Sequence, residues 1–313
     1  MTRAETTVDE GAAGQTLAAV VRALLDVPWS KAKSLCTSGR VWIDGAACTD
    51  LARRVKAGER IVVDEAAPKK RAGVLDRDAI LHSDADVVVV RKDADLLTLP
   101  FHGDEKDTLV DQTRAALQRM IPRRRKGRDP MVGVVQRLDK DTTGVLVFAR
   151  NMSAKRSLEA QLRAHTVGRR YLAIAHGAVA TATHTTSLVQ DRGDGLRGSW
   201  GTRPEHRGPP PPKAKVSVTH VRLLEALKGA SLCECRLETG RQHQIRIHLA
   251  EAGHPLVGER VYVRDHQGPT IEAGRPMLHA TELSFEHPRT GERLRFRVDP
   301  PDDFERLLAR LRG

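Results

Sequence analysis

Charged side chains interrupt an apolar stretch near the middle of the chain. Arg137, Asp139 and Asp141 lie between two apolar runs, residues 132–135 and 145–149. Apolar runs of this length predict strands that enter a protein interior, so the chain carries charge to the edge of a core and turns there. An aspartate at such an edge is either half of a structural ion pair or a reactive carboxylate. The spacing alone does not choose between Asp139 and Asp141.

The overall charge of the chain is basic. Its 313 residues include 52 Lys and Arg against 40 Asp and Glu, which gives a formal net charge of +12. A charge of this sign favours polyanionic partners, and nucleic acid before others. Aromatic residues make up only 3% of the chain, which argues against binding of single strands on a platform of stacked rings.

A block of basic residues precedes the central turn. Residues 114–128 contain seven Lys or Arg and no acidic residue. Such a block is either a solvated loop or a loop that contacts phosphates, and its place directly before the turn favours phosphate contacts. The expected contacts include Arg123, Arg124, Arg125 and Lys126.

Several segments resemble the RluA-type RNA pseudouridine synthases, and they occur in the same order. Residues 137–139 (Arg-Leu-Asp) are similar to the family's signature, residues 170–173 to its tyrosine segment, and residues 240–249 to its helix motif. The resemblance covers roughly residues 80–304. It implies the pseudouridine synthase fold, an α+β fold with a mixed, mainly antiparallel sheet. The chain's interleaved strands and helices, without a steady βαβ rhythm, also indicate α+β.

The resemblance implies roles for four residues. Asp139 is the expected catalytic carboxylate, Arg246 its partner, and Tyr171 the ring that packs on the target base. Arg137 is expected to fill the space that a flipped nucleotide leaves in the RNA. These roles are physically sensible, because a carboxylate that stays ionised in a pocket needs an opposite charge that cannot lose its proton. The target base must also leave the RNA stack before a side chain can reach it.

The implied reaction is the isomerisation of uridine to pseudouridine, for which we expect no cofactor. The aspartate could attack the sugar, attack ring carbon six or support an elimination, and the sequence leaves these routes open. The chain contains no phosphate-binding loop motif and no dinucleotide fingerprint, and its four cysteines lack zinc spacing. His243 and His248 invite a metal interpretation, but no acidic third ligand accompanies them, so we predict no metal site.

The chain departs from the family pattern at several positions. Gln136 stands where histidine is usual, Gln242 where threonine or serine is usual, and Glu259 where aspartate is usual. Residues 92–96 read Lys-Asp-Ala-Asp-Leu in place of Lys-Pro-Ala-Gly-Leu. These departures bear on the choice of substrate more than on catalysis.

The elements that must position these residues follow from periodicity and turn signals. Val87 to Arg91 reads as a strand buried on both faces, and Asn151 can cap a helix that runs to about His165. Further strands are expected at 80–82, 169–174, 215–223, 231–237, 283–285 and 294–298. Helices are expected at 242–252 and around 304–311, and a long irregular loop at 193–212.

Residues 14–64 resemble the small alpha-L RNA-binding module of ribosomal proteins. An amphipathic helix over 17–25, a second short helix capped by Ser30, and strands at 41–43 and 60–63 carry the resemblance. In that module the second helix faces RNA. We therefore expect RNA contacts from Lys31, Lys33 and Arg40. The predicted organisation is this module, a linker over 65–79, and a catalytic domain over 80–313.

Three functions remain open at this point. The resemblance favours an enzyme that acts on structured RNA, ribosomal RNA before tRNA. A non-catalytic RNA-binding or ribosome-assembly factor on the same fold is the alternative, and a hydrolase with paired aspartates is a weaker third. The polar start of the chain is no signal peptide and no apolar run could span a bilayer, so we expect a cytoplasmic monomer without a membrane partner.

Overall fold

The chain divides into two compact units in the computed structural model. One unit comprises Met1–Val74 and Leu99–Ala115, and the other comprises Leu75–Thr98 and Ala116–Gly313. The structure describes residues 3–48, 51, 53–67, 73–100, 106–121, 129–203 and 206–313. The division differs from the predicted boundaries, because the first unit starts before residue 14 and includes residues 99–115.

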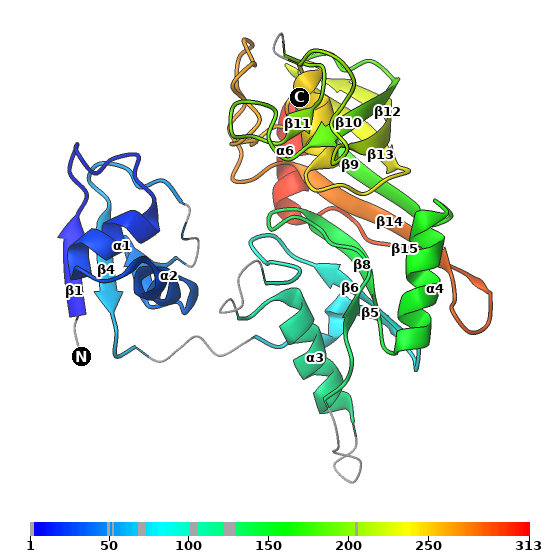
Figure 1. Ribbon diagram of the computed structural model, residues 1–313, viewed down its shortest axis with the longest axis horizontal. Coiled ribbons are helices and arrows are strands. Elements are labelled where there is room, and N and C mark those ends of the chain that lie inside the picture. Colours follow the sequence, from blue (N-terminus) through cyan, green and yellow to red (C-terminus); the bar gives the residue numbers. More distant parts are fainter. Residues whose placement is uncertain are drawn as a thin grey trace. The chain divides into compact units, whose positions relative to one another are not determined.

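Among its described residues, the first unit contains a small sheet, helices α1 and α2, and the start of a further helix that continues into the second unit (Figure 1). Its strands β1 (Arg3–Thr7), β4 (Arg60–Asp64), β2 (Val41–Ile43) and β3 (Ala46–Ala47) pair antiparallel in that order. Helix α1 (Leu17–Leu25) begins at Thr16, whose hydroxyl accepts the N–H of Ala19. It buries the predicted apolar stripe together with α2 (Trp29–Thr37) and the sheet.

Two details of the first unit differ from the prediction. Strand β1 pairs with β4 along its whole length, although the polar residues before Gly14 gave no strand signal. Helix α2 begins at Trp29, after Pro28, so Ser30 lies inside the helix and does not cap it. Proline suits this place because it has no N–H to leave unpaired and its φ is already helical.

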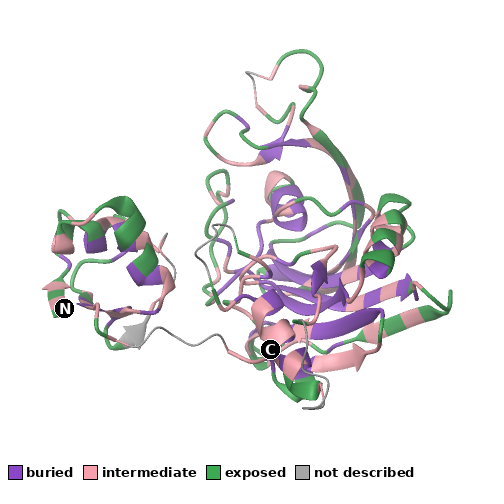
Figure 2. Cartoon of the chain, turned by 60° about the horizontal axis from the view of Figure 1, so that its bottom comes forward, coloured by how far each residue is buried: buried purple, intermediate pink, exposed green. Residues whose placement is uncertain are grey.

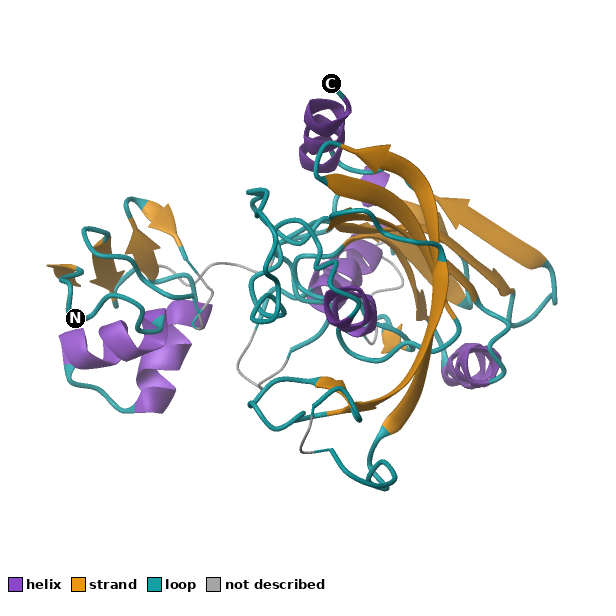
Figure 3. Ribbon diagram, turned by 90° about the horizontal axis from the view of Figure 1, so that it is seen from above, coloured by secondary structure: helices purple, strands orange, loops and turns teal. Residues whose placement is uncertain are grey.

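The second unit is built on one large mixed sheet, which curves in Figure 3. Nine strands follow one path, in the order β11-β10-β12-β13-β9-β14-β8-β6-β5, with β15 on β14 and β7 on β8. All pairs are antiparallel except β14 with β8. The predicted mixed, mainly antiparallel α+β fold is confirmed. The strands are β5 (Ile80–Ser83), β6 (Val87–Lys92), β7 (Gly133–Val134), β8 (Thr143–Ala149), β9 (Gly168–His176), β10 (Ala182–Val189), β11 (Gly198–Ser199), β12 (Lys215–Leu227), β13 (Ala230–Leu237), β14 (Leu278–Glu286) and β15 (Arg293–Arg297).

The helices of the second unit bury apolar faces against this sheet. Helix α4 (Met152–Arg163) begins where Asn151 accepts the N–H of Ala154, as predicted, and packs on β6, β8 and β14. Helix α6 (Asp302–Arg312) packs four apolar side chains against β9 and β13. Helix α5 (Gln244–Glu251) is buried along most of its length and contacts β11 and β12. Figure 2 shows the buried strands and helix faces together.

Sequence reasoning missed three further elements. Helix α3 (Leu109–Met120) includes Arg114 and Arg119, which were expected in a phosphate-contacting loop, and Arg114 pairs with Asp111 on the same helix at 3.1 Å. Strand β10 was not predicted, and β11 lies inside the segment that was expected to be an irregular loop. The rest of the basic block, residues 122–128, lies outside the described residues. No helix among the described residues is long and apolar enough to cross a membrane.

Candidate active site

The loop between β7 and β8 carries Asp139, and Lys92 holds its backbone. Lys92 is fully buried at the end of β6, whose all-valine run enters the core. Its Nζ donates to the carbonyl oxygens of Asp93, Lys140 and Thr142 at 2.8, 2.7 and 2.9 Å. Burial lowers the pKa of Lys92 to about 7, while the carboxylates of Asp141 and Asp139 act in the opposite direction. The ammonium group thus fixes the chain directly after Asp139.

Two other side chains hold the same loop. The hydroxyl of Thr98 donates to the carbonyl of Leu138 at 2.7 Å and accepts its N–H at 3.1 Å. Arg275 Nη1 donates to the carbonyl of Asp141 at 3.1 Å. The residues on both sides of Asp139 are therefore fixed through their backbones, which fixes the position from which the Asp139 side chain extends.

Gly144 follows this loop at the start of β8, where no other residue fits. Its φ is +123°, and a Cβ there would lie 2.2 Å from the carbonyl oxygen of Ala280. The close approach belongs to the parallel pairing of β8 with β14. Glycine thus allows the strand that leaves the Asp139 loop to enter the sheet directly.

Helix α5 brings a cation to Asp139. Arg246 Nη1 lies 3.6 Å from Asp139 Oδ2, and the two side chains are 10% and 18% exposed. The start of the helix is fixed by the buried Gln244, whose Oε1 accepts the N–H of Arg241 and whose Nε2 donates to the carbonyl of Val218. Asp139 is thereby distinguished from Asp141, because Arg246 forms its ion pair with Asp139.

A second carboxylate, Glu259, holds the rest of the Arg246 guanidinium. Arg246 donates from Nε and Nη2 to the two oxygens of Glu259, both at 2.7 Å, and the Glu259 side chain is fully buried. Burial opposes ionisation of Glu259, but bonds from Arg246 and from the N–H groups of Val261 and Arg260 outweigh it, so the pKa of Glu259 lies below its ordinary value. The bidentate pair aims the remaining Nη1 at Asp139.

Tyr171 lies in β9 and is buried close enough to feel the charge of Asp139. The strand pairs on one side with β13 and on the other with β14, at Cys235 and Ala280. Burial raises the pKa of Tyr171, the charge of Arg169 opposes that rise, and the charge of Asp139 adds to it. The phenol is therefore neutral, and its ring is a buried apolar surface.

Among the described residues, one cluster of side chains could hold a metal ion, and it is formed by Asp84, Asp86 and His287. Its groups already have protein partners. Asp86 accepts a bidentate pair of bonds from Arg289, and the same Oδ2 of Asp84 lies 2.7 Å from His82 Nε2 and 3.0 Å from His287 Nε2. The cluster ties the turn before β6 to the β14–β15 hairpin.

An aspartate side chain with a fixed guanidinium beside it and a buried aromatic ring in the same unit suits chemistry at a sugar anomeric carbon. A profile of the RNA pseudouridylate synthase family matches residues 86–251, which include this carboxylate, ring and guanidinium. An uncharacterized RNA pseudouridine synthase of Synechocystis is 35% identical over 285 residues, or 90% of this chain and 84% of the relative. This chain belongs to the RluA-type RNA pseudouridine synthases.

A second relative agrees with this assignment, and a solved structure shows the same fold. The ribosomal large subunit pseudouridine synthase D of Xylella fastidiosa is 34% identical over 323 residues, which cover 98% of this synthase and 92% of the relative. The solved structure of human RNA pseudouridylate synthase domain containing 4 superposes with a TM-score of 0.60 at 22% identity. It covers 75% of this synthase and 93% of the human chain, and it shows a shared fold.

The structure places the three predicted catalytic residues in one region of the synthase. Asp139 and Arg246 form the predicted pair, although the tightest bonds of Arg246 go to Glu259, and Tyr171 is buried within reach of the Asp139 charge. Sequence reasoning treated Glu259 and the segment after Lys92 only as departures from a pattern. The signal for the segment after Lys92 was present in the sequence, because Lys92 ends a strand that begins with four valines.

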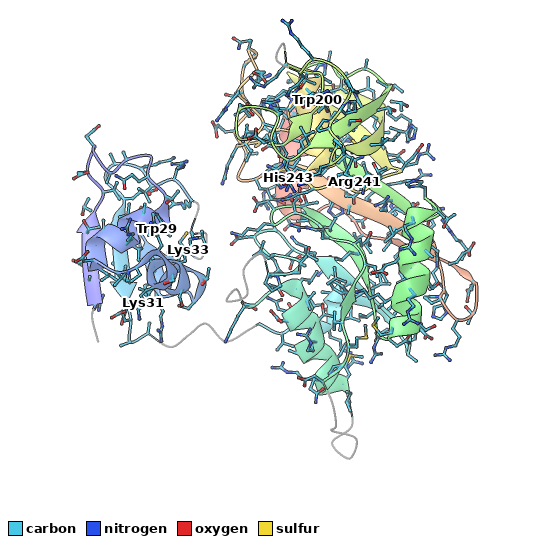
Figure 4. All side chains as sticks on the ribbon, viewed as in Figure 1. Trp29, Lys31, Lys33, Trp200, Arg241 and His243 are labelled. Carbon is cyan, nitrogen blue, oxygen red and sulfur yellow. The ribbon has the colours of Figure 1, made fainter. Side chains whose placement is uncertain are left out.

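The residues that were predicted to bind RNA have varied surroundings. Arg137 is exposed on the Asp139 loop, and Lys31 and Lys33 lie on α2 with Trp29 (Figure 4). Lys31 Nζ lies 3.0 Å from a carboxylate oxygen of Glu65, and Arg40 Nε donates to the carbonyl of Ala67 at 2.9 Å. Arg123, Arg124, Arg125 and Lys126 lie outside the described residues.

Trp29 is an exposed aromatic side chain that the sequence reasoning passed over. It is 44% exposed at the start of α2, and the Arg22 guanidinium lies 5.2 Å from its ring centroid. An exposed indole beside lysines can stack on a base while the lysines contact phosphates. Trp29 therefore joins Lys31 and Lys33 as a candidate RNA contact.

Proposed function

We propose that this synthase converts a uridine of ribosomal RNA into pseudouridine, with Asp139 as the reactive carboxylate. The observation that carries the proposal is the contact between Asp139 Oδ2 and Arg246 Nη1, 3.6 Å apart, on a loop whose backbone is fixed on both sides of Asp139. A fixed guanidinium stabilises the anion without donating its proton to it. Fixed positions also remove much of the entropic part of a reaction barrier.

The reaction exchanges one glycosidic bond for another within one nucleotide. The bond between ribose C1′ and uracil N1 breaks, the base turns, and C1′ bonds to uracil C5. C5 then loses its hydrogen as a proton and N1 gains one, so the product is an isomer of the substrate. Asp139 supplies the negative charge at C1′ or on the base, and the Tyr171 ring gives the turning base an apolar surface.

The substrate assignment is supported by charge and by relatives. Relatives such as the Xylella protein are named ribosomal large subunit enzymes, and the net charge of +12 suits a large polyanion. We assign phosphate contacts to α2 of the first unit, which resembles the alpha-L RNA-binding module. We also assign to the exposed Arg137, two residues before Asp139, the role of filling the gap left by a flipped uridine.

Tritium release tests this function directly. A large-subunit rRNA transcript labelled with [5-³H]uridine should lose tritium to water when it is incubated with the synthase, because C5 exchanges its hydrogen for the new bond. Labelled tRNA transcripts provide the comparison, and release from tRNA alone would contradict the assignment to rRNA. Binding of both RNAs without any release would favour the non-catalytic RNA-binding factor.

A further inference from the structure

His243 faces Asp139 from the position directly before the helix that carries Arg246. It precedes α5 by one residue and adopts a left-handed backbone conformation, with φ of +59° and ψ of +17°. From this position His243 reaches the same carboxylate as Arg246. The His243 Nε2 lies 3.8 Å from Asp139 Oδ1, while Arg246 approaches Oδ2. His243 and Arg241, which both precede the helix in the sequence, are labelled in Figure 4.

Tyr262 fixes the other side of the His243 ring. Its Oη lies 2.7 Å from His243 Nδ1, and the two rings meet edge to face with centroids 5.7 Å apart. The same tyrosine ring lies 5.4 Å from the Arg246 guanidinium carbon. One buried phenol therefore braces both side chains that flank Asp139.

The surroundings determine which nitrogen of His243 carries the proton. Burial lowers the pKa of His243 below its ordinary value, against the charge of Asp139, so the ring is neutral near pH 7. Burial raises the pKa of Tyr262 to about 12, so the phenol keeps its hydrogen. With the Tyr262 hydroxyl donating to Nδ1, the imidazole proton lies on Nε2 and points at a carboxylate oxygen. The other tautomer would set a lone pair against that oxygen.

We infer that His243 is a positioning residue that orients the Asp139 carboxylate through its Nε2–H, in a tautomer selected by Tyr262. This inference rests on the proposed function of Asp139. Arg246 holds one carboxylate oxygen and His243 holds the other, so the plane of the carboxylate is set from two sides. At 3.8 Å the His243 contact is longer than a hydrogen bond, as contacts between catalytic groups often are before substrate binds.

Three substitutions of His243 separate positioning from stability. His243→Gln places an amide N–H near the position of Nε2, whereas His243→Asn places one near Nδ1, and His243→Ala has neither. Asparagine tolerates the left-handed backbone better than glutamine, so His243→Asn should be at least as stable as His243→Gln. The single-turnover rate, by contrast, should be higher for His243→Gln than for His243→Asn.

We expect His243→Gln to stay within about 10-fold of wild type and the Asn and Ala variants to fall about 100-fold, with unchanged affinity for the rRNA transcript. Equal rates for Gln and Ala, or a wild-type rate for Ala, would overturn the inference. Tritium release by the wild type, set against release by Asp139→Asn, tests the proposed function separately in the same assay.

A double-mutant cycle tests the part assigned to Tyr262. Tyr262→Phe keeps the ring that packs near Arg246 and removes the hydroxyl that selects the tautomer. It should slow turnover about 10-fold in the wild-type background and leave the rate of His243→Ala unchanged. Additive losses in the double variant would show that Tyr262 acts independently of His243. That result would contradict the selection of the His243 tautomer by Tyr262.

Discussion

Arg246 serves two carboxylates with one guanidinium. Its Nε and Nη2 bond to the buried Glu259, and its Nη1 approaches the half-buried Asp139. The planar fork permits this division, since a single ammonium group cannot make a bidentate pair and also reach a second carboxylate. The family resemblance predicted a pair, and the structure shows a three-membered network.

Arg246→Ala should abolish turnover and destabilise the fold by about 3–5 kcal/mol, because Glu259 would remain buried without its cation. Arg246→Lys should recover much of the stability and little of the activity. Urea unfolding and single-turnover rates measure the two effects. Arg306→Ala, an exposed arginine on α6, is the matched control, and full activity of Arg246→Ala would contradict this assignment.

Lys92 acts on the backbone of the Asp139 loop. Lys92→Met should destabilise the second unit by about 2 kcal/mol or more, because three carbonyl groups lose a charged donor even though the burial of an ammonium is relieved. The Asp139 loop should also loosen, and turnover should fall. Arg91→Met changes the neighbouring, partly exposed basic residue and should leave both quantities near wild type. Unchanged stability and rate for Lys92→Met would contradict the proposed role of Lys92 in fixing the Asp139 loop.

At the level of secondary-structure elements, the turn that carries Glu259 supports the active site by holding Arg246 of α5. Glu259 accepts N–H groups of Arg260 and Val261, both at 2.9 Å, as well as the bonds from Arg246. An ion pair between Glu259 and Arg246 therefore joins the turn to the helix. The stability that this ion pair contributes should depend on pH.

Because the pKa of Glu259 is lowered in the folded state, its ionised form stabilises the fold above the unfolded value of 4.5, and this contribution is lost as the pH falls through the folded value. The stability of the wild type should therefore drop more steeply than that of Glu259→Gln between about pH 5 and pH 3. Urea unfolding across this range measures the difference. Parallel curves would show that Glu259 does not contribute in its ionised form.

Elements with a strong local signal were predictable from sequence, and elements defined by distant partners were not. The valine run of β6, the stripe of α1 and the Asn151 cap of α4 each gave a pattern that the structure follows. Strand β1 has alternating exposed and half-buried residues and depends on pairing with β4, which no local pattern reveals. The same holds for the site, where Asp139 was identified by resemblance but its contacts with His243 required the folded chain.

The whole molecule combines a catalytic unit with a smaller unit, and we propose that the smaller unit binds RNA. On α2, Lys33 is half-buried and Lys31 is partly committed to Glu65. Arg40 bonds to the backbone of Ala67, so its substitution tests stability as much as binding. The lysines are the cleaner probes of phosphate contact.

Lys31→Ala and Lys33→Ala should each flatten the slope of log affinity against log salt by about 0.7–0.9, because each lost phosphate contact releases one counterion fewer. The rate at saturating RNA should not change, since Asp139 is untouched. Lys56→Ala, an exposed lysine of the same unit outside α2, controls for net charge. If all three variants keep the wild-type slope, α2 does not contact the RNA.

Comparison of Asp139→Asn with Asp141→Asn in single-turnover tritium release from labelled large-subunit rRNA tests which carboxylate of the loop is reactive. Both variants remove one negative charge from the same loop, but Arg246 contacts Asp139. We expect no release above background for Asp139→Asn, with wild-type affinity for RNA and a folded protein, and substantial release for Asp141→Asn. Sustained release by Asp139→Asn, or its loss only in Asp141→Asn, would contradict the assignment of Asp139 as the reactive carboxylate.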